Sequence, residues 1–104
     1  MSDTDEAPRV VDVPKENRFV VERDGHVAEL DYHRNGRRFV LIHTGVPKSM
    51  EGHGIGGHLV QAAVDRAARE HLVLVPWCPF ARTWLEHHPD LAAGVEIDWS
   101  PRPE

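Results

Sequence analysis

The spacing of hydrophobic residues along the chain changes near residue 45. Before that point, three short runs rich in β-favouring residues follow one another, at 18–22, 26–33 and 38–44. In the second run, Ala28, Leu30 and Tyr32 share one face by alternation, as in a strand with one buried side. Two hairpin turn signals separate the runs: Asp24-Gly25, and Asn35-Gly36, which predicts a type I′ turn with positive φ at both residues. The first 45 residues therefore predict an antiparallel meander of three strands.

From residue 55 the apolar positions follow a helical period. The stripe consists of Ile55, Leu59, Val60, Ala63, Val64, Ala67 and Ala68 and predicts a helix over 55–70. A continuous apolar run at 72–77 then predicts a strand that is covered on both faces. Because a strand, a helix and a further strand form a right-handed crossover, we expect the strands at 38–44 and 72–77 to run parallel. Pro79 suits the first position of a second helix, which ends at about His88.

These elements predict a single α/β (α+β) domain over residues 17–93. Residues 1–16 contain two prolines, five acidic residues and little periodicity, and they predict a mobile N-terminal tail. Residues 94–104 form a C-terminal tail, in which 95–99 is a candidate short edge strand.

A glycine-rich segment joins the third strand to the first helix. Gly52, Gly54 and Gly56 alternate, and Gly57 follows directly. A strand, a glycine loop and a helix form an anion site, because free backbone N–H groups and the positive end of the helix dipole attract a negative ligand. We therefore expect a ligand that carries phosphate. The alternative is a turn that only lets the helix pack tightly, although a turn needs one glycine rather than four.

Two other glycine motifs fit less well. The spacing Gly52-x-Gly54-x-x-Gly57 matches the dinucleotide fingerprint, but that site needs the first βα unit of a larger parallel sheet, and here three antiparallel strands come first. The phosphate loop of nucleotide hydrolases also fails, since no Gly-Lys-Ser/Thr follows the glycines.

The segment from Glu51 to Gly56, E-G-H-G-I-G, resembles the acetyl-CoA signature of the GCN5-related N-acetyltransferases, (Gln/Arg)-x-x-Gly-x-Gly/Ala. The order of elements is also similar to that fold. The match is closer to the minimal branch of the family, with small acetyltransferase-like members of about 100 residues. The further marks of this branch are A-x-L-x-Y (28–32), H-T-x-V-P (43–47), P-x-C-P-F (76–80) and H-P (88–89).

The resemblance implies a protein that binds acetyl-CoA and transfers its acetyl group to an amine. The strands at 38–44 and 72–77 would separate at their ends, and the pantetheine arm would lie in the gap. The cofactor-binding residues that it implies are Thr44, Val46, Gly52, His53, Gly54, Ile55, Gly56, Gly57 and Phe80. The chain departs from the family at Glu51, where Arg or Gln is usual, and a carboxylate there repels a diphosphate unless it turns outward or pairs with Lys48. It also lacks the helices that usually wall the acceptor side.

Cys78 and His43 are the candidate catalytic residues, and the resemblance implies that the thioester arrives near both. Cys78 precedes Pro79 at a helix N-terminus, which favours a nucleophilic thiolate that could accept an acetyl group. Alternatively, Cys78 only lines the thioester pocket, or it is an inert, buried apolar residue. His43 ends the third strand and could accept a proton from an attacking amine, or simply cap the strand. Glu29 and Asp31 are rival bases, or solvated carboxylates.

Composition narrows the possible partners. A net charge of −5 argues against nucleic acid as the main partner. No apolar run approaches the roughly 20 residues of a membrane span, and the polar start predicts no signal peptide. The single cysteine suits the reducing cytoplasm.

The eight histidines show no ligand spacing, so no metal is expected. Trp77 and Trp84 predict core around the second helix, with ligand stacking as the alternative.

Three functions remain open on the sequence alone. The first is an N-acetyltransferase with an unidentified amine acceptor. The second is a non-catalytic CoA-binding or protein-interaction module on the same fold. The third is a small domain that binds a phosphate ligand unrelated to CoA.

Overall fold

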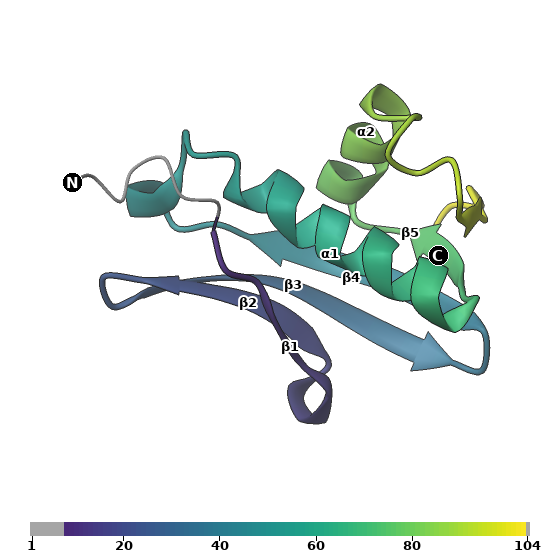
Figure 1. Cartoon of the computed structure of the whole chain (residues 1–104), viewed down its shortest axis with the longest axis horizontal. Helices are drawn as coiled ribbons and strands as arrows, with labels where there is room; N and C mark the ends of the chain where they lie inside the picture. Colours follow the sequence, from purple (N-terminus) through teal and green to yellow (C-terminus); the bar gives the residue numbers. More distant parts are fainter. Residues whose placement is uncertain (1–7, 104) are drawn as a thin grey trace.

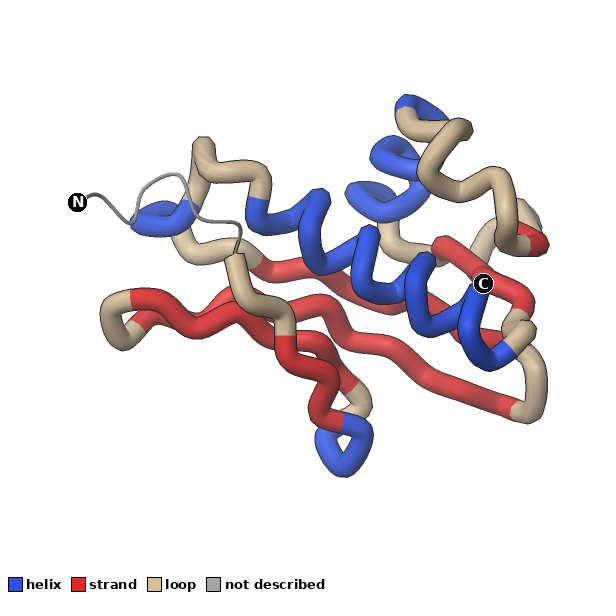
Figure 2. Tube along the Cα trace, in the orientation of Figure 1, coloured by secondary structure: helices blue, strands red, loops and turns tan. Residues whose placement is uncertain are grey.

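The computed structural model describes residues 8–103, which form two layers (Figure 1). A six-stranded mixed sheet makes one layer, and two helices lie together over one of its faces (Figure 2). The strands, in sheet order, are β1 (Val11–Val13), β2 (Arg18–Arg23), β3 (His26–Asn35), β4 (Arg38–Gly45), β5 (Val73–Pro76) and β6 (Glu96–Ile97). The helices are α1 (Ile55–Glu70) and α2 (Pro79–His87), with short 3₁₀ turns η1 (Pro14–Glu16) and η2 (Lys48–Met50). The expected α/β class is confirmed.

Strands β2, β3 and β4 form the expected antiparallel meander, but one of its turns differs from the prediction. Asp24 (φ 53°) and Gly25 (φ 79°) both have positive φ, as a type I′ turn requires. The prediction of a type I′ turn at Asn35-Gly36 is wrong, because Asn35 still pairs with Arg38 in the ladder. The two-residue loop is Gly36-Arg37, and only Gly36 has positive φ (61°), the position that glycine occupies in a type II′ turn.

The crossover through α1 is confirmed. Strand β5 runs parallel to β4, with residues 38–41 paired to 73–76. Strand β6 lies parallel on the outer edge of β5 and uses two residues of the candidate edge strand at 95–99.

The core lies between the sheet and the helices. The apolar stripe of α1 is buried as predicted, except for Ala68, which is exposed. On the sheet side, three aromatic rings cluster: the centroid of Tyr32 lies 5.0 Å from that of Phe19 and 4.8 Å from that of Phe39. Ala28 and Leu30 share the buried face of Tyr32, in agreement with the alternation of the sequence.

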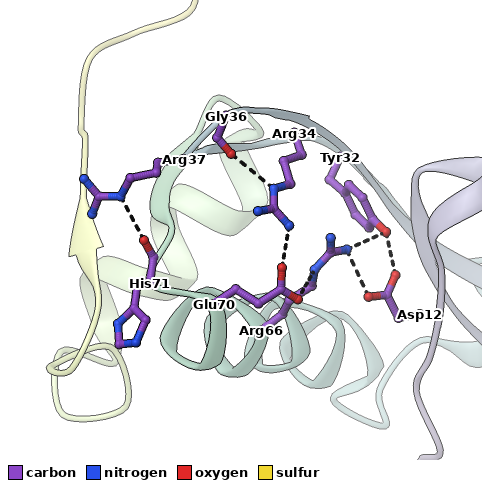
Figure 3. A network of polar contacts seen from close by, with 8 residues as sticks. All are labelled: Asp12, Tyr32, Arg34, Gly36, Arg37, Arg66, Glu70 and His71. Carbon is purple, nitrogen blue, oxygen red and sulfur yellow. Dashed lines mark hydrogen bonds and ion pairs between the residues drawn. The ribbon is translucent and has the colours of Figure 1, made fainter.

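The sequence analysis assigned residues 1–16 to a mobile tail, whereas residues 11–16 form β1 and η1; residues 1–7 lie outside the described part of the chain. A polar network holds β1 in place (Figure 3). The Tyr32 hydroxyl donates to Asp12 (2.5 Å), and Arg66 Nη1 donates to the Tyr32 hydroxyl (2.8 Å) and to Asp12 (3.0 Å). Arg66 Nε also donates to Glu70 (3.0 Å). Strand β1 is thereby tied to both β3 and α1.

Candidate functional site

A cleft of about 390 Å³ opens where β4 ends and both helices begin. Its walls are formed by Thr44, Val46, Met50, Glu51, Gly52, Gly54, Ile55, Gly56, Gly57 and Phe80. Every residue that the sequence analysis named for cofactor binding lines this cleft except His53, which is exposed beside it. Met50 and Glu51 line it as well and were not among those residues. Glu51 was noted only as a departure from the family signature.

The segment between η2 and α1 leaves a row of backbone donors free. Within residues 8–103, no N–H group of residues 52–57 donates to a backbone carbonyl. The neighbouring groups are used: the Glu51 N–H donates to the Lys48 carbonyl (3.2 Å) and the His58 N–H to the Gly54 carbonyl (3.1 Å). Free N–H groups at the positive end of a helix attract anions, so this wall of the cleft can hold a phosphate.

The four glycines serve two different structural purposes. Gly52 (φ 86°) and Gly54 (φ 70°) adopt left-handed backbone conformations that other residues rarely tolerate. At Gly56, an added Cβ would lie 2.7 Å from Cζ of Phe80, and at Gly57 it would lie 2.6 Å from Nε1 of Trp84. The alternative that the glycines only let the helix pack tightly therefore explains Gly56 and Gly57. It is compatible with anion binding, because their N–H groups stay free.

Beyond the cleft, β4 and β5 separate. Their ladder ends where Leu41 pairs with Pro76, while β4 continues to Gly45. The Trp77 N–H donates to the Val75 carbonyl (3.1 Å), a tight turn that ends β5. Cys78 follows, and its N–H donates to the Leu41 carbonyl (2.9 Å).

Cys78 is the residue before the first turn of α2, as the sequence predicts, but it is not open to solvent. Its side chain is only 3% exposed, and its Sγ lies 3.2 Å from Oγ1 of Thr44. Thr44 lines the cleft and Cys78 does not. The thiol is therefore part of the buried core and contacts Thr44, which lines the cleft.

A β-bulge in β4 places His43 on the other side of the sheet. Tyr32 pairs with Leu41 and Asp31 pairs with His43, so Ile42 is an extra residue opposite β3. After the bulge, Thr44 lies opposite the buried Leu30 and His43 lies opposite Asp31. Paired residues share a face, so Thr44 faces the helices. His43 faces the opposite side of the sheet, the uncovered face, on which neither α1 nor α2 lies. The structure does not bring His43 and Cys78 together.

The uncovered face beside His43 carries charged side chains. A Cβ at Gly45 would lie 3.4 Å from Nε2 of His43 and 3.8 Å from Oε1 of Glu29, so both side chains lie over Gly45. Arg18 pairs with Glu29 (3.6 Å) and with Asp31 (3.3 Å). The two carboxylates named as rival bases are therefore neutralised in part by one guanidinium.

A second, smaller cleft of about 210 Å³ adjoins the first across Gly54 and Gly57. Its other walls are formed by His58, Gln61, Trp84 and Leu91. Trp84 was predicted to be core, yet it is half-buried and stacks on His88 with ring centroids 4.1 Å apart.

In the part of the chain that the structure describes, no helix is long and apolar enough to span a membrane, and no three His, Cys, Asp or Glu side chains gather as metal ligands.

Comparison with known proteins identifies the family. Residues 18–94 match the family model described as GCN5-related N-acetyltransferase, which covers most of the chain. The protein belongs to the GCN5-related N-acetyltransferase family. The structure is also similar to the solution structure of a GCN5-like protein from Staphylococcus aureus, described as a candidate N-acetyltransferase, with 26% sequence identity, a TM-score of 0.69, and coverage of 88% of this chain and 90% of that one. The resemblance seen in the glycine loop and the expected GCN5-related fold are thus confirmed.

Proposed function

We propose that this GCN5-related N-acetyltransferase binds acetyl-CoA in the larger cleft and transfers its acetyl group to an amine. The observation that carries the proposal is the run of free N–H groups at residues 52–57 in the wall of that cleft. The diphosphate would lie on these donors at the N-terminus of α1. The pantetheine arm would follow Thr44 and Val46 beyond the end of the β4–β5 ladder, where β4 has a free edge.

The chemistry that fits this arrangement is direct transfer. The amine nitrogen attacks the thioester carbonyl carbon, the carbon–sulfur bond breaks, and the CoA thiolate leaves. His43, on the uncovered face, would take the proton that the amine loses, so the acceptor would approach from the side opposite the cofactor. Cys78 fits a role in closing the thioester pocket better than a role as nucleophile, because its thiol is buried and contacts Thr44.

A titration and an activity assay together test the proposal. Added CoA should shift the backbone amide signals of residues 44–57, and acetyl-CoA should release free thiol faster with at least one member of a panel of amines. The variant His43→Gln should lower the turnover number at least about tenfold while the affinity for acetyl-CoA stays within twofold, the effect expected on losing a general base.

The variant Cys78→Ala separates the two mechanisms. In direct transfer, it keeps turnover, and no acetyl adduct appears on the wild-type protein by intact mass. An adduct that is lost with Cys78→Ala would contradict direct transfer. No perturbation of residues 52–57 by millimolar CoA would contradict the proposed function as a whole, and a rise in melting temperature with another nucleotide would then favour a different phosphate ligand.

A non-catalytic CoA-binding or protein-interaction module is the second candidate function. Two observations favour it: Glu51 lines the cleft, and His43 lies on the opposite face of β4 from Thr44. Binding of CoA without turnover of any amine in the panel would support this alternative.

A further inference from the structure

Glu51 occupies an unusual place for an acidic residue. Among the described residues that line the larger cleft, it alone is ionisable. It directly precedes the six free N–H groups of residues 52–57, while its own N–H is used by the Lys48 carbonyl. At the position where a diphosphate would meet the first of these donors, the chain therefore supplies a carboxylate and no donor.

No cationic side chain of the described residues pairs directly with this carboxylate. Within residues 8–103, Glu51 forms no ion pair, and neither Lys48 nor His53 lines the cleft, although both are exposed next to it. The pairing with Lys48 that would neutralise Glu51 is thus not present among the described residues. The net charge of −5 adds a long-range repulsion of the same sign.

We propose that Glu51 is a specificity-determining residue that shifts recognition of the acyl donor from its diphosphate to its pantetheine arm. The inference rests on the proposed function, since it concerns the same cleft. The free N–H groups attract the diphosphate and Glu51 opposes them, so the phosphates contribute little to affinity. Selectivity then comes from the uncharged arm, which Thr44, Val46 and Phe80 would contact.

Salt tests this arrangement when the wild-type protein is compared with Glu51→Gln, because the other charges of the protein contribute equally to the repulsion in both. Screening weakens an attraction between unlike charges and relieves a repulsion between like charges, over a Debye length of about 10 Å at 0.1 M ionic strength and about 3 Å at 1 M. If repulsion by Glu51 dominates, added salt tightens the binding of CoA. It leaves pantetheine, which has no charge, unaffected.

The experiment compares three ligands that share the arm: CoA, 4′-phosphopantetheine and pantetheine. Dissociation constants are measured by calorimetry for the wild-type protein and Glu51→Gln at two salt concentrations. Glu16→Gln is the matched control, because it removes the same charge from an exposed residue in η1 that lines neither cleft. We expect Glu51→Gln to lower the dissociation constant of CoA at least about fivefold at low salt. The dissociation constant of phosphopantetheine should fall by less, and that of pantetheine should not change.

The outcomes separate this inference from the proposed function. Equal CoA affinities for the wild-type protein and Glu51→Gln, or equal tightening of CoA by Glu16→Gln, would overturn the role of Glu51 and leave acetyl-CoA binding intact. An equal gain for pantetheine would also overturn it. If none of the three ligands binds either protein, the proposed function fails and the inference fails with it. Far-ultraviolet circular dichroism verifies that the variants are folded.

Discussion

Gly56 and Gly57 are adjacent in α1, yet their neighbours differ in freedom to move. Phe80, which faces Gly56, is 45% exposed, and the contact involves the tip of its ring. Trp84, which faces Gly57, is held by the stacked ring of His88, whose Nδ1 lies 2.7 Å from the Trp84 carbonyl oxygen. A methyl group at 56 can therefore push a ring into solvent, whereas a methyl group at 57 meets a ring that is already fixed.

We predict that Gly57→Ala destabilises the protein and that Gly56→Ala barely changes its stability. Overpacking lowers the free energy of unfolding by about 1–3 kcal/mol, and the higher helix propensity of alanine raises it by up to about 1 kcal/mol. Gly57→Ala should therefore lower it by about 1–2 kcal/mol. Urea unfolding of both variants measures the difference. A Gly56→Ala protein that is less stable than Gly57→Ala would show that Phe80, not Trp84, is the rigid neighbour.

At the scale of elements, the polar network of Figure 3 fixes the edge strand β1 through residues that are far apart in sequence. Arg66 is only 8% exposed and lies over the rings of Tyr32 (5.2 Å) and Phe39 (4.9 Å). A buried guanidinium is costly unless its donors are used, and here Asp12, Tyr32 and Glu70 accept from it. The network therefore makes β1 depend on both β3 and α1.

This arrangement predicts a loss of stability at high pH. Burial, followed by the hydrogen bond and negative charge of Asp12, raises the pKa of Tyr32 to about 12 from the ordinary value of 10.0. A pKa that is higher in the folded state gives stability that is complete below pH 10 and lost as the pH rises towards 12. Between these limits the free energy of unfolding should fall more steeply for the wild-type protein than for Tyr32→Phe. Tyr32→Phe itself should be about 1–2 kcal/mol less stable at neutral pH.

Spectroscopy can follow the same group directly. Tyr32 is the only tyrosine of the chain, so tyrosinate absorbance reports its ionisation alone. The native midpoint should lie well above the midpoint in concentrated urea. Coincident midpoints would mean that the hydroxyl is not held in the network.

The sequence predicted these elements well where local periodicity is strong and poorly where distant partners decide. The helix at 55–70 was found to the residue, because its apolar stripe and glycine start are local signals. Strand β1 was missed, because three residues carry no period and Asp12 depends on Arg66, 54 positions away. The bulge at Ile42 was missed for a similar reason: an isoleucine is ordinary in a strand, and only its pairing with β3 shows it to be extra.

The same limit explains which parts of the site could be predicted from the sequence. Loop residues that act through their backbone stay together because they are contiguous, and they line one cleft. Two strand residues that are one position apart, His43 and Thr44, end on opposite faces, and His43 is separated from Cys78 as a result. To predict which side chains of different elements lie close together, one needs the register of the strands in the sheet. No sequence pattern in this chain specifies that register.

At the scale of the whole molecule, α1 and α2 lie on the same side of the sheet, and no α-helix of residues 8–103 lies on the other side (Figure 1). His43, Glu29 and Asp31 lie on this side of β3 and β4, and Arg18 is the cation paired with the two carboxylates. In the proposed reaction the acceptor approaches here, towards a protein with a net charge of −5. A cationic acceptor is therefore attracted, while the anionic donor is repelled by Glu51 on the other side.

Donor and acceptor should consequently respond to salt in opposite directions. With acetyl-CoA saturating, so that its own salt dependence drops out, a diamine should have a higher kcat/KM than a monoamine of equal basicity at low ionic strength. The ratio, counted per amino group because a diamine has two, should approach one at about 0.5 M salt, where charges more than a few ångströms apart are screened. Glu29→Gln, which removes one carboxylate from the uncovered face, should lower the ratio, and Glu16→Gln provides the control for net charge. A ratio that does not change with salt would mean that acceptors are not chosen by charge and that the uncovered face does not guide them.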